Sequence, residues 1–190
     1  MAINREAANK VLAEIDRGEL AQVACDLVNI PSPTGGEKAG AEFILDWYKA
    51  NGLKAIRREV EKDRPNAVGI LKGQGTGLSL MFNGHLDTGF TLTDEDLLMV
   101  SDLEPISELR GSIRDGKVYG HGASNMKGGV AAFMVAAKAI KKSGLKLKGD
   151  VILAGVVGEI SRAPVGLWQT KEYRGEGIGT RHLLTHGIQS

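Results

Sequence analysis

A histidine and an aspartate two positions apart could together form part of a metal site. The pair is His85 and Asp87, and it follows the alternating apolar residues 78–82. Side chains on an extended segment repeat every second residue, so both should point to the same side. Imidazole is a common zinc ligand, and a neighbouring carboxylate can hold the ring in its ligating orientation. A short His-x-Asp pattern also occurs where a histidine is simply hydrogen-bonded at a strand end.

Two further polar residues are placed where they could join this pair. Asn125 lies in the glycine-rich run 120–129, just before a predicted helix, where its side chain is a natural N-cap. Glu159 follows the apolar run 151–157 after a single glycine, Gly158. Strand ends of a layered α/β domain meet along one edge of the sheet, and ligands bind there. A shared site with the histidine and aspartate is therefore physically reasonable.

Hydrophobic periodicity predicts the elements that would position these residues. The predicted helices are residues 3–16, 19–29, 37–51 and 127–142, with Gly18 ending the first and Gly52 closing the third. The predicted strands are residues 53–60, 67–71, 78–82 and 148–157, and Asp115-Gly116 predicts a two-residue hairpin within residues 113–119.

Two of these strands differ in the burial that their residues predict. Leu78, Leu80 and Phe82 alternate with Ser79, Met81 and Asn83, and this pattern with its apolar bulk predicts a strand that is at least half buried. Residues 148–157 include a nearly continuous apolar run, which suits a strand in a sheet covered on both faces. The pattern of strands and helices predicts an α/β protein.

Composition narrows the class of protein. The 190 residues carry a formal net charge of +1, which implies no polyanionic partner such as a nucleic acid. No window approaches the ~20 apolar residues of a membrane span and the N-terminus is polar, so we expect a cytoplasmic protein with no membrane partner. Cys25 lies in an apolar helical context and should be a buried small hydrophobe. Residues 91–110 are acidic and aperiodic, which is typical of a solvated segment.

The glycine-rich run 73–77 leaves a nucleotide-binding alternative open. A phosphate-binding loop needs a strand before it and a helix after it. Here the run leads into a predicted strand, which disfavours a nucleotide site.

Three separated motifs carry a resemblance to a known family. They are NGHLDT at 83–88, YGHGASNMKGG at 119–129 and VILAGVVGE at 151–159. In this order, with the Ile30-Pro31-Ser32 segment, they resemble the zinc-dependent amidohydrolase and peptidase family of acetylornithine deacetylase, succinyl-diaminopimelate desuccinylase, aminoacylase and glutamate carboxypeptidase. The resemblance runs over most of residues 20–159. It implies a three-layer α/β sandwich with a mixed, mainly parallel sheet covered by helices.

The resemblance also implies roles for the residues of the site. His85 corresponds to a zinc-ligating histidine, and Asp87 to the acid that supports it. Position 125 corresponds to a carboxylate that bridges two zinc ions, position 159 to the general acid/base and position 160 to a further carboxylate ligand. This chain departs from the family at two of these positions, since it has Asn125 where aspartate is usual and Ile160 where glutamate is usual.

These departures weaken the implied metal site. Two dications about 4 Å apart repel each other and need bridging anions. The amide of Asn125 supplies no charge and Ile160 supplies no oxygen. We therefore expect a single metal ion, a weakened site or ligands recruited from elsewhere. The resemblance implies zinc as the cofactor, as one or two ions, and its occupancy in this chain is doubtful. His182 and His186 are spaced i, i+4 and could be replacement ligands, although a terminal pair of this kind is more often exposed.

The resemblance carries an expectation about domains as well. The family's catalytic domain is usually discontinuous and is interrupted by a smaller domain that forms a homodimer. On this comparison, residues 1–190 are the N-terminal portion of the catalytic domain, and the dimerisation domain and the C-terminal return of the chain are absent from them. His121 lies beside the expected site, and Lys127 is expected to anchor its helix start instead of touching substrate.

The favoured function is metal-dependent hydrolysis of an amide bond in an N-acyl amino acid, a related small molecule or a short peptide. His85 and the residue at 125 would hold the metal, Asp87 would orient the imidazole, and Glu159 would move the proton. The alternative is a truncated or non-catalytic relative that keeps the fold but has an incomplete metal site. Asn125 and Ile160 favour this alternative.

Overall fold

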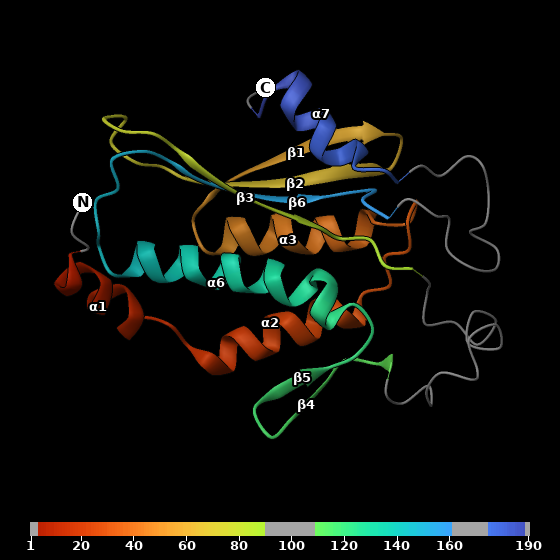
Figure 1. Cartoon of the computed structure of the whole chain (residues 1–190), viewed down its shortest axis with the longest axis horizontal. Coiled ribbons are helices and arrows are strands. Elements are labelled where there is room, and N and C mark those ends of the chain that lie inside the picture. The colour runs from red at the N-terminus through yellow and green to blue at the C-terminus, as the bar shows by residue number, and fades with distance from the viewer. Residues whose placement is uncertain (1–3, 90–108, 161–174, 189–190) are drawn as a thin grey trace.

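The computed structural model describes residues 4–89, 109–160 and 175–188 of the chain (Figure 1). Three helices come first, namely α1 (Arg5–Ala13), α2 (Arg17–Asn29) and α3 (Lys38–Ala50). The strands β1 (Lys54–Glu61), β2 (Arg64–Leu71), β3 (Leu80–His85), β4 (Ser112–Arg114) and β5 (Lys117–Tyr119) follow. A π-helical turn η1 (Ala123–Lys127), α6 (Gly128–Lys142), β6 (Val151–Val156) and α7 (Ile178–His186) complete the described elements.

The first helix ends before the position that Gly18 predicts. Asp16 Oδ1 accepts hydrogen bonds from the amides of Gly18 and Glu19 at 2.8 and 3.1 Å, which makes Asp16 the N-cap of α2. The prediction that a helix over 3–16 is ended by Gly18 is therefore wrong, because α1 ends at Ala13 and Gly18 lies in the first turn of α2. The predicted helices over 19–29 and 37–51 are confirmed as α2 and α3 to within two residues at each end.

The four main strands form a mixed sheet in the order β1-β2-β6-β3. The pairings β1–β2 and β2–β6 are antiparallel, and β3–β6 is parallel. A mixed sheet is confirmed, but the described part of it is not mainly parallel. The reason is that β1 and β2 form a hairpin, while α6 lies on the crossover that brings β6 parallel to β3.

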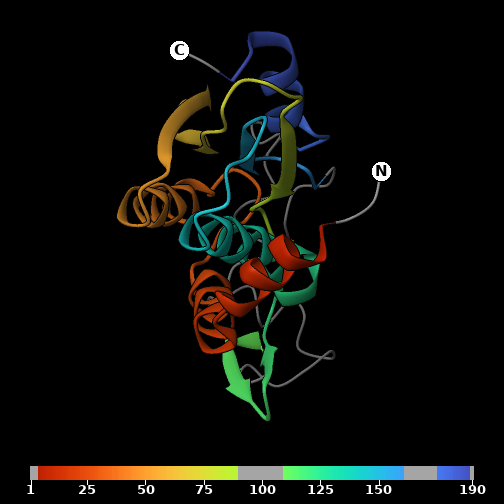
Figure 2. The same ribbon diagram turned by 90° about the vertical axis from the view of Figure 1, so that its left-hand side faces the viewer.

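Helices cover both faces of this sheet, so the three-layer α/β arrangement is confirmed. Figures 1 and 2 show α3 and α6 on one face, with α1 and α2 packed beneath them, and α7 on the opposite face. The larger hydrophobic cluster lies on the α3 and α6 side and includes Tyr48, Met134 and Leu153. A smaller cluster joins Val68 and Val156 to Leu183 of α7. The nearly continuous apolar run in β6 is explained by this double coverage.

The strand that leads to the candidate site is more exposed than its alternation predicts. Leu78, just before β3, is 98% exposed, and Leu80 and Phe82 are 57% and 44% exposed. The expectation of a half-buried strand over 78–82 is therefore wrong for these apolar side chains. Among the described strands β3 is at the edge of the sheet, and only its last residues, Gly84 and His85, are buried. Alternation alone cannot distinguish an edge strand from a central one.

Smaller predictions are settled by local geometry. The hairpin is confirmed as β4–β5, with Asp115 and Gly116 at φ angles of 50° and 70°, as a two-residue turn of this kind requires. The glycine-rich run 73–77 leads into β3 and not into a helix, so the condition for a phosphate-binding loop is not met there. Cys25 is buried in α2, as expected. Most of the acidic stretch 91–110 lies outside the described residues.

None of the described helices combines the length and the apolar character that crossing a lipid bilayer requires.

Candidate active site

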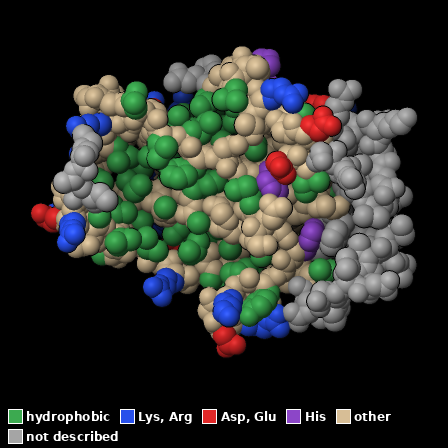
Figure 3. All heavy atoms as spheres, viewed as in Figure 1, with side chains coloured by type: hydrophobic (Ala, Val, Ile, Leu, Met, Phe, Trp, Pro, Cys, Tyr) green, Lys and Arg blue, Asp and Glu red, His purple; other side chains and the backbone are tan. Residues whose placement is uncertain are grey.

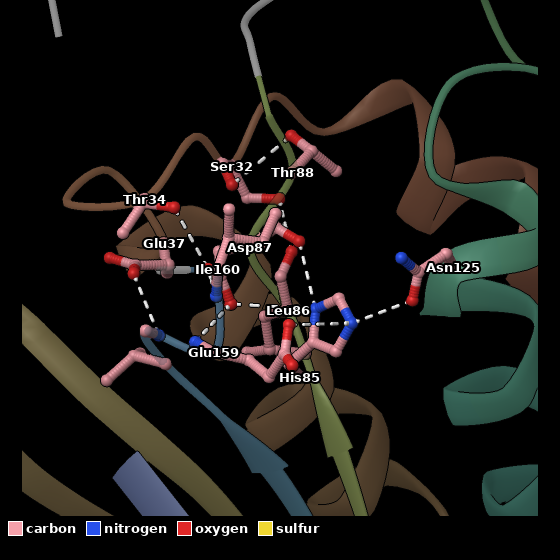
Figure 4. A network of polar contacts seen from close by, with 12 residues as sticks. Ser32, Thr34, Glu37, His85, Leu86, Asp87, Thr88, Asn125, Glu159 and Ile160 are labelled. Atoms are coloured by element: carbon pink, nitrogen blue, oxygen red, sulfur yellow. Dashed lines mark hydrogen bonds and ion pairs between the residues drawn. The ribbon is translucent and has the colours of Figure 1, made fainter. Parts of the chain in front are cut away.

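The parallel pairing of β3 with β6 brings the candidate residues together. His85, the last residue of β3, is in register with Val156, the last residue of β6. The segments that follow the two strands therefore leave the sheet side by side, one carrying Asp87 and the other carrying Glu159 (Figure 4). This is the strand-end edge at which ligands bind in α/β proteins.

His85 lies at the centre of the cluster and is 6% exposed. Its Nδ1 lies 3.0 Å from the backbone oxygen of Asp87 and 3.5 Å from the Oδ1 of the same residue. Its Nε2 lies 2.9 Å from Asn125 Oδ1 and 3.7 Å from Glu159 Oε2 (Figure 4). The structure thus brings the other three residues predicted from the sequence, Asp87, Asn125 and Glu159, around the imidazole ring of His85.

The surroundings of His85 favour its protonated form in the metal-free chain. Burial alone would lower the pKa of His85, but the contacts with Asp87 and Asn125 and the negative charges of Asp87 and Glu159 raise it to about 9. Because Nδ1 faces a carbonyl oxygen, this nitrogen keeps its hydrogen, and Nε2 is the nitrogen that becomes available as a ligand once the ring loses its second proton.

Asp87 links the histidine to the chain that carries Glu159. Its Oδ2 accepts hydrogen bonds from Thr34 Oγ1 at 2.9 Å and from the Ile160 amide at 2.9 Å, and its Oδ1 accepts from the Glu159 amide at 3.0 Å. Burial raises the pKa of Asp87, but His85 and these donors outweigh it and leave the pKa below its usual range. Asp87 is therefore a charged, fully hydrogen-bonded group with little freedom to move.

Asn125 does not cap the helix that follows it. The prediction that its side chain is the N-cap of that helix is wrong, because α6 begins at Gly128 and its cap residue is Lys127. Asn125 instead lies in the turn η1 with φ −135° and ψ 92°, a non-helical conformation. Its side-chain oxygen is directed to His85, so a contact between distant parts of the chain has replaced the local one.

Glu159 and Ile160 share a backbone clamp but differ in what their side chains offer. The Glu159 side chain is 56% exposed, so its carboxylate can meet a substrate or a water molecule. The amide of Ile160 is bound to Asp87, and its side chain has no oxygen or nitrogen to offer a metal.

Sequence reasoning missed the residues of the loop before α3 that support the site. Ser32 Oγ donates to the backbone oxygen of Leu86 at 2.7 Å, and the Thr88 amide donates to the Ser32 oxygen at 2.9 Å. Thr34 bonds Asp87, as described above, and all of these side chains are buried. The proline-rich composition of 31–36 predicted a loop, and only the Ile30-Pro31-Ser32 part of the resemblance pointed to this segment.

The two histidines of α7 have their described contacts with each other and with β1. His182 and His186 of α7 stack on each other with ring centroids 4.3 Å apart, and Arg58 of β1 donates to the backbone oxygen of His186. Burial, together with the charge of Lys127, lowers the pKa of His121 to about 4. Lys127 Nζ donates to the Ile30 oxygen at 2.7 Å, in keeping with a role in anchoring the start of α6.

The donor atoms fit one divalent cation better than two. Within the described residues there is no group of three or more histidine, cysteine, aspartate or glutamate side chains that could hold a metal. The imidazole Nε2 of His85 and the neutral Oδ1 of Asn125 lie together beside the carboxylate of Glu159. This set provides a nitrogen, an amide oxygen and one nearby negative charge, but no anion to hold two dications together.

Comparison with known proteins bears on the same residues. Residues 81–170 match the model of Peptidase family M20/M25/M40. The chain is 33% identical over 151 residues to the N-formyl-4-amino-5-aminomethyl-2-methylpyrimidine deformylase of Bacillus subtilis (strain 168), covering 77% of this chain and 34% of that relative. It is 27% identical over 135 residues to the succinyl-diaminopimelate desuccinylase of Parvibaculum lavamentivorans, covering 70% of this chain and 32% of that relative.

Solved structures give the same fold. A tripeptidase from Staphylococcus aureus aligns with a TM-score of 0.64 at 20% identity, covering 93% of this chain and 42% of the tripeptidase chain. The chain spans about a third of the length of the curated relatives that it matches. The chain carries the three motifs in order, folds like this tripeptidase and matches the family model from Met81 through the candidate site. It therefore belongs to Peptidase family M20/M25/M40.

Proposed function

We propose that this chain carries catalytic residues of a metal-dependent hydrolase that cleaves an amide bond in an N-acyl amino acid, a related small molecule or a short peptide. The observation that carries the proposal is the convergence of His85 Nε2, Asn125 Oδ1 and Glu159 Oε2 at the ends of two parallel strands. Relatives named as a deformylase and a desuccinylase support the substrate class, since both names denote removal of an acyl group. On this proposal residues 1–190 are part of a catalytic domain.

Each residue has a role that follows from its surroundings. His85 and Asn125 would hold the cation, which by the family resemblance is zinc. When bound, the cation supplies Lewis-acid polarisation of a carbonyl group and of a water molecule. Asp87 holds the imidazole through its backbone oxygen at 3.0 Å and its nearby carboxylate, so that Nε2 stays directed toward Asn125.

Glu159 is the group that can move protons. Its carboxylate is half exposed and lies beside the imidazole, while its backbone is fixed by Asp87. It can accept a proton from an attacking water and return that proton to the departing amine, which is the usual work of a general acid/base. Ile160 takes no part in this chemistry except through its amide, which helps to fix Asp87.

The proposal is tested by measuring bound Zn²⁺ and hydrolysis of N-formyl and N-acetyl amino acids with the same preparation. We expect Glu159→Gln to bind Zn²⁺ as the wild-type chain does but to lose turnover by a factor on the order of 10²–10⁴. His85→Ala should lose the metal. Glu42→Gln, an exposed glutamate on α3, is the matched control and should change neither measurement. Equal turnover in the wild-type chain and Glu159→Gln would rule out the assigned role.

A second candidate function is a non-catalytic relative with an incomplete metal site. It is favoured by Asn125 and Ile160, which together remove two negative charges from the positions implied by the family resemblance. The same measurements separate the two. Absence of both bound Zn²⁺ and turnover in the wild-type chain, and in a version extended at its C-terminus, would select the non-catalytic candidate.

A further inference from the structure

A buried ion pair lies next to the candidate site and has no role in the chemistry proposed above. Glu37, which immediately precedes α3, has no exposed surface, and Arg64 at the start of β2 is 2% exposed. Arg64 Nε donates to Glu37 Oε2 at 3.0 Å, and Arg64 Nη2 donates to Glu37 Oε1 at 2.7 Å. This two-point geometry fixes the orientation of the carboxylate.

The carboxylate of Glu37 also reaches the chain that carries the proposed base. The Gly158 amide donates to Glu37 Oε1 at 3.1 Å, whereas Glu37 makes no side-chain bond to the start of its own helix. Gly158 has a φ angle of 63°, a left-handed conformation that glycine adopts without strain, and it immediately precedes Glu159. The helix-start carboxylate is therefore used to hold the turn after β6.

Two carboxylates together hold three consecutive amides of this turn. Glu37 accepts from Gly158, while Asp87 accepts from Glu159 and Ile160 at 3.0 and 2.9 Å (Figure 4). Hydrogen bonds to ionised acceptors are shorter and stronger than those between neutral groups. The backbone at 159 is thus fixed from the α3 side and from the β3 side at once.

Stability alone is a weak explanation for this ion pair. Burying two charges carries a desolvation cost that well-packed apolar residues avoid, so such pairs often add little net stability. The described packing of α3 on β2 already has Tyr48, which is fully buried against Gly69. What apolar residues at these positions could not supply is an acceptor for the Gly158 amide.

We propose that Glu37, held in place by Arg64, is a positioning residue that keeps Glu159 beside His85. The inference rests on the proposed function, because it takes Glu159 to be the group that moves the proton. Asp87 accepts from the Glu159 amide itself. Glu37 accepts from the amide of the preceding residue, Gly158, and so keeps the backbone of the turn from moving away from His85. Loss of Glu37 should change the placement of the Glu159 carboxylate, which lies 3.7 Å from His85 Nε2, without removing any metal donor.

Two variants separate positioning from folding. Glu37→Gln keeps the side-chain shape but removes the charge. Glu37→Leu combined with Arg64→Met removes both buried charges and the acceptor. Glu61 Oε2, which lies 2.6 Å from Arg64 Nη1 in the wild-type chain, loses this partner, but the Glu61 side chain is 41% exposed and can be solvated. The double variant leaves no buried charge behind, whereas in the single variant Arg64 keeps its ion pair with Glu61 but faces a neutral amide in place of the Glu37 carboxylate.

Lys38→Gln is the matched control. Lys38 is adjacent to Glu37 and its Nζ binds Asp63 Oδ1 at 2.8 Å, so it joins the start of α3 to the turn between β1 and β2, close to Arg64. This pair is exposed and does not reach Gly158. If loss of any contact between these elements were enough to loosen the turn after β6, the control variant would show increased exchange as well.

The measurements are amide hydrogen exchange by NMR on the metal-free full chain, Zn²⁺ affinity by calorimetry, and kcat and KM for an N-acyl amino acid. We expect exchange at Gly158, Glu159 and Ile160 to rise at least about tenfold in the double variant, to rise less in Glu37→Gln, whose amide oxygen can still accept from Gly158, and to stay unchanged in Lys38→Gln. We expect kcat to fall about tenfold to a hundredfold, since small misplacements of a catalytic group have effects of this size. KM and Zn²⁺ affinity should change less than about twofold, because binding groups are retained.

The outcomes distinguish this inference from the proposed function. Unchanged exchange at these three amides in the double variant overturns the positioning role, whatever happens to activity. Increased exchange with kcat unchanged from wild type also overturns it. If neither the wild-type chain nor a version extended at its C-terminus binds Zn²⁺ or has turnover, the proposed function fails, and increased exchange confined to residues 158–160 still supports the role of Glu37 in placing Glu159.

Discussion

At the scale of single residues, Asn125 decides how strongly this site can hold a cation. Its neutral amide stands 2.9 Å from His85 Nε2, where the family resemblance implies a carboxylate. A negative charge about 4 Å from a unit positive charge is worth up to about 4 kcal/mol at the effective dielectric constant near a protein surface. We expect Asn125→Asp to tighten Zn²⁺ binding by a factor on the order of ten or more, as titration calorimetry would measure.

The control for this prediction removes the donor and adds no charge. Asn125→Ala should weaken Zn²⁺ binding, because it takes away the oxygen that faces His85. Equal Zn²⁺ affinity in the wild-type, aspartate and alanine proteins would show that position 125 does not contact the metal, and His85 would then need other partners.

Thr34 is the residue through which the loop before α3 supports Asp87. Its hydroxyl donates to Asp87 Oδ2 at 2.9 Å and both side chains are buried. Thr34→Val keeps the shape but removes the donor, so we expect the free energy of unfolding to fall by about 1–3 kcal/mol. Urea denaturation measures this change. Thr34→Ser, which retains the hydroxyl, should lose less, and a larger loss for serine than for valine would mean that packing of the methyl group dominates.

At the scale of elements, α7 is fixed against the end of β6 by backbone contacts that leave no room for a side chain. Gly179 donates to the Val157 oxygen at 3.1 Å, and Asn66 Nδ2 donates to the Gly179 oxygen at 2.9 Å. A Cβ on Gly179 would lie 2.4 Å from the Val157 oxygen and 2.6 Å from Asn66 Oδ1. An alanine at 179 must therefore move the helix away from the strand.

We expect Gly179→Ala to lower the free energy of unfolding by about 1–3 kcal/mol, as overpacking usually does. Hydrogen exchange should increase most in α7. The control is Gly129→Ala in α6, where a Cβ would meet Met126 Cε at an ordinary 3.5 Å, and its effect should stay within about 0.5 kcal/mol. A Gly179 variant as stable as this control would mean that α7 accommodates the methyl group by a small shift.

The elements show where prediction from sequence succeeds and where it stops. Periodic helices such as α2 and α3 and the Asp115-Gly116 hairpin follow from local patterns, and so they were predictable. The short helix α7 follows the undescribed residues 161–174 and was not predicted as an element. The exposure of β3 depends on its place at the sheet edge, which no local pattern encodes.

The same limit applies to the candidate site. His85, Asp87, Asn125 and Glu159 could be singled out because each has a chemically distinctive side chain next to a recognisable strand or helix. The N-cap assigned to Asn125 was wrong because capping and a long-range bond to histidine favour the same residue type. The Glu37–Arg64 pair joins a helix start to a strand start 27 residues apart, and nothing in either local sequence indicates it.

At the scale of the whole molecule, the described residues expose a broad apolar surface beside β3. Figure 3 shows hydrophobic side chains gathered on the face that carries β3, α6 and α1 in Figure 1. Leu78, Leu80 and Phe82, in or just before β3, and Leu12 and Ile15, in or just after α1, are among the exposed large apolar side chains of the described residues. A sheet edge of this kind, with exposed apolar side chains along it, favours self-association of the chain.

We therefore expect the purified 190-residue chain to form larger species as its concentration is raised, and Leu80→Lys to shift it toward monomer. Leu80 is 57% exposed, so the substitution should change the free energy of unfolding by only about 0.5 kcal/mol or less. A lysine at the edge adds charge and must be desolvated if another strand approaches, which opposes association.

Sedimentation equilibrium over a range of concentrations measures the effect. The matched control is Leu184→Lys, which is 71% exposed and lies on α7, on the face of the sheet away from α3 and α6. A chain that stays monomeric, or equal dissociation by both lysine variants, would show that this apolar edge does not drive association.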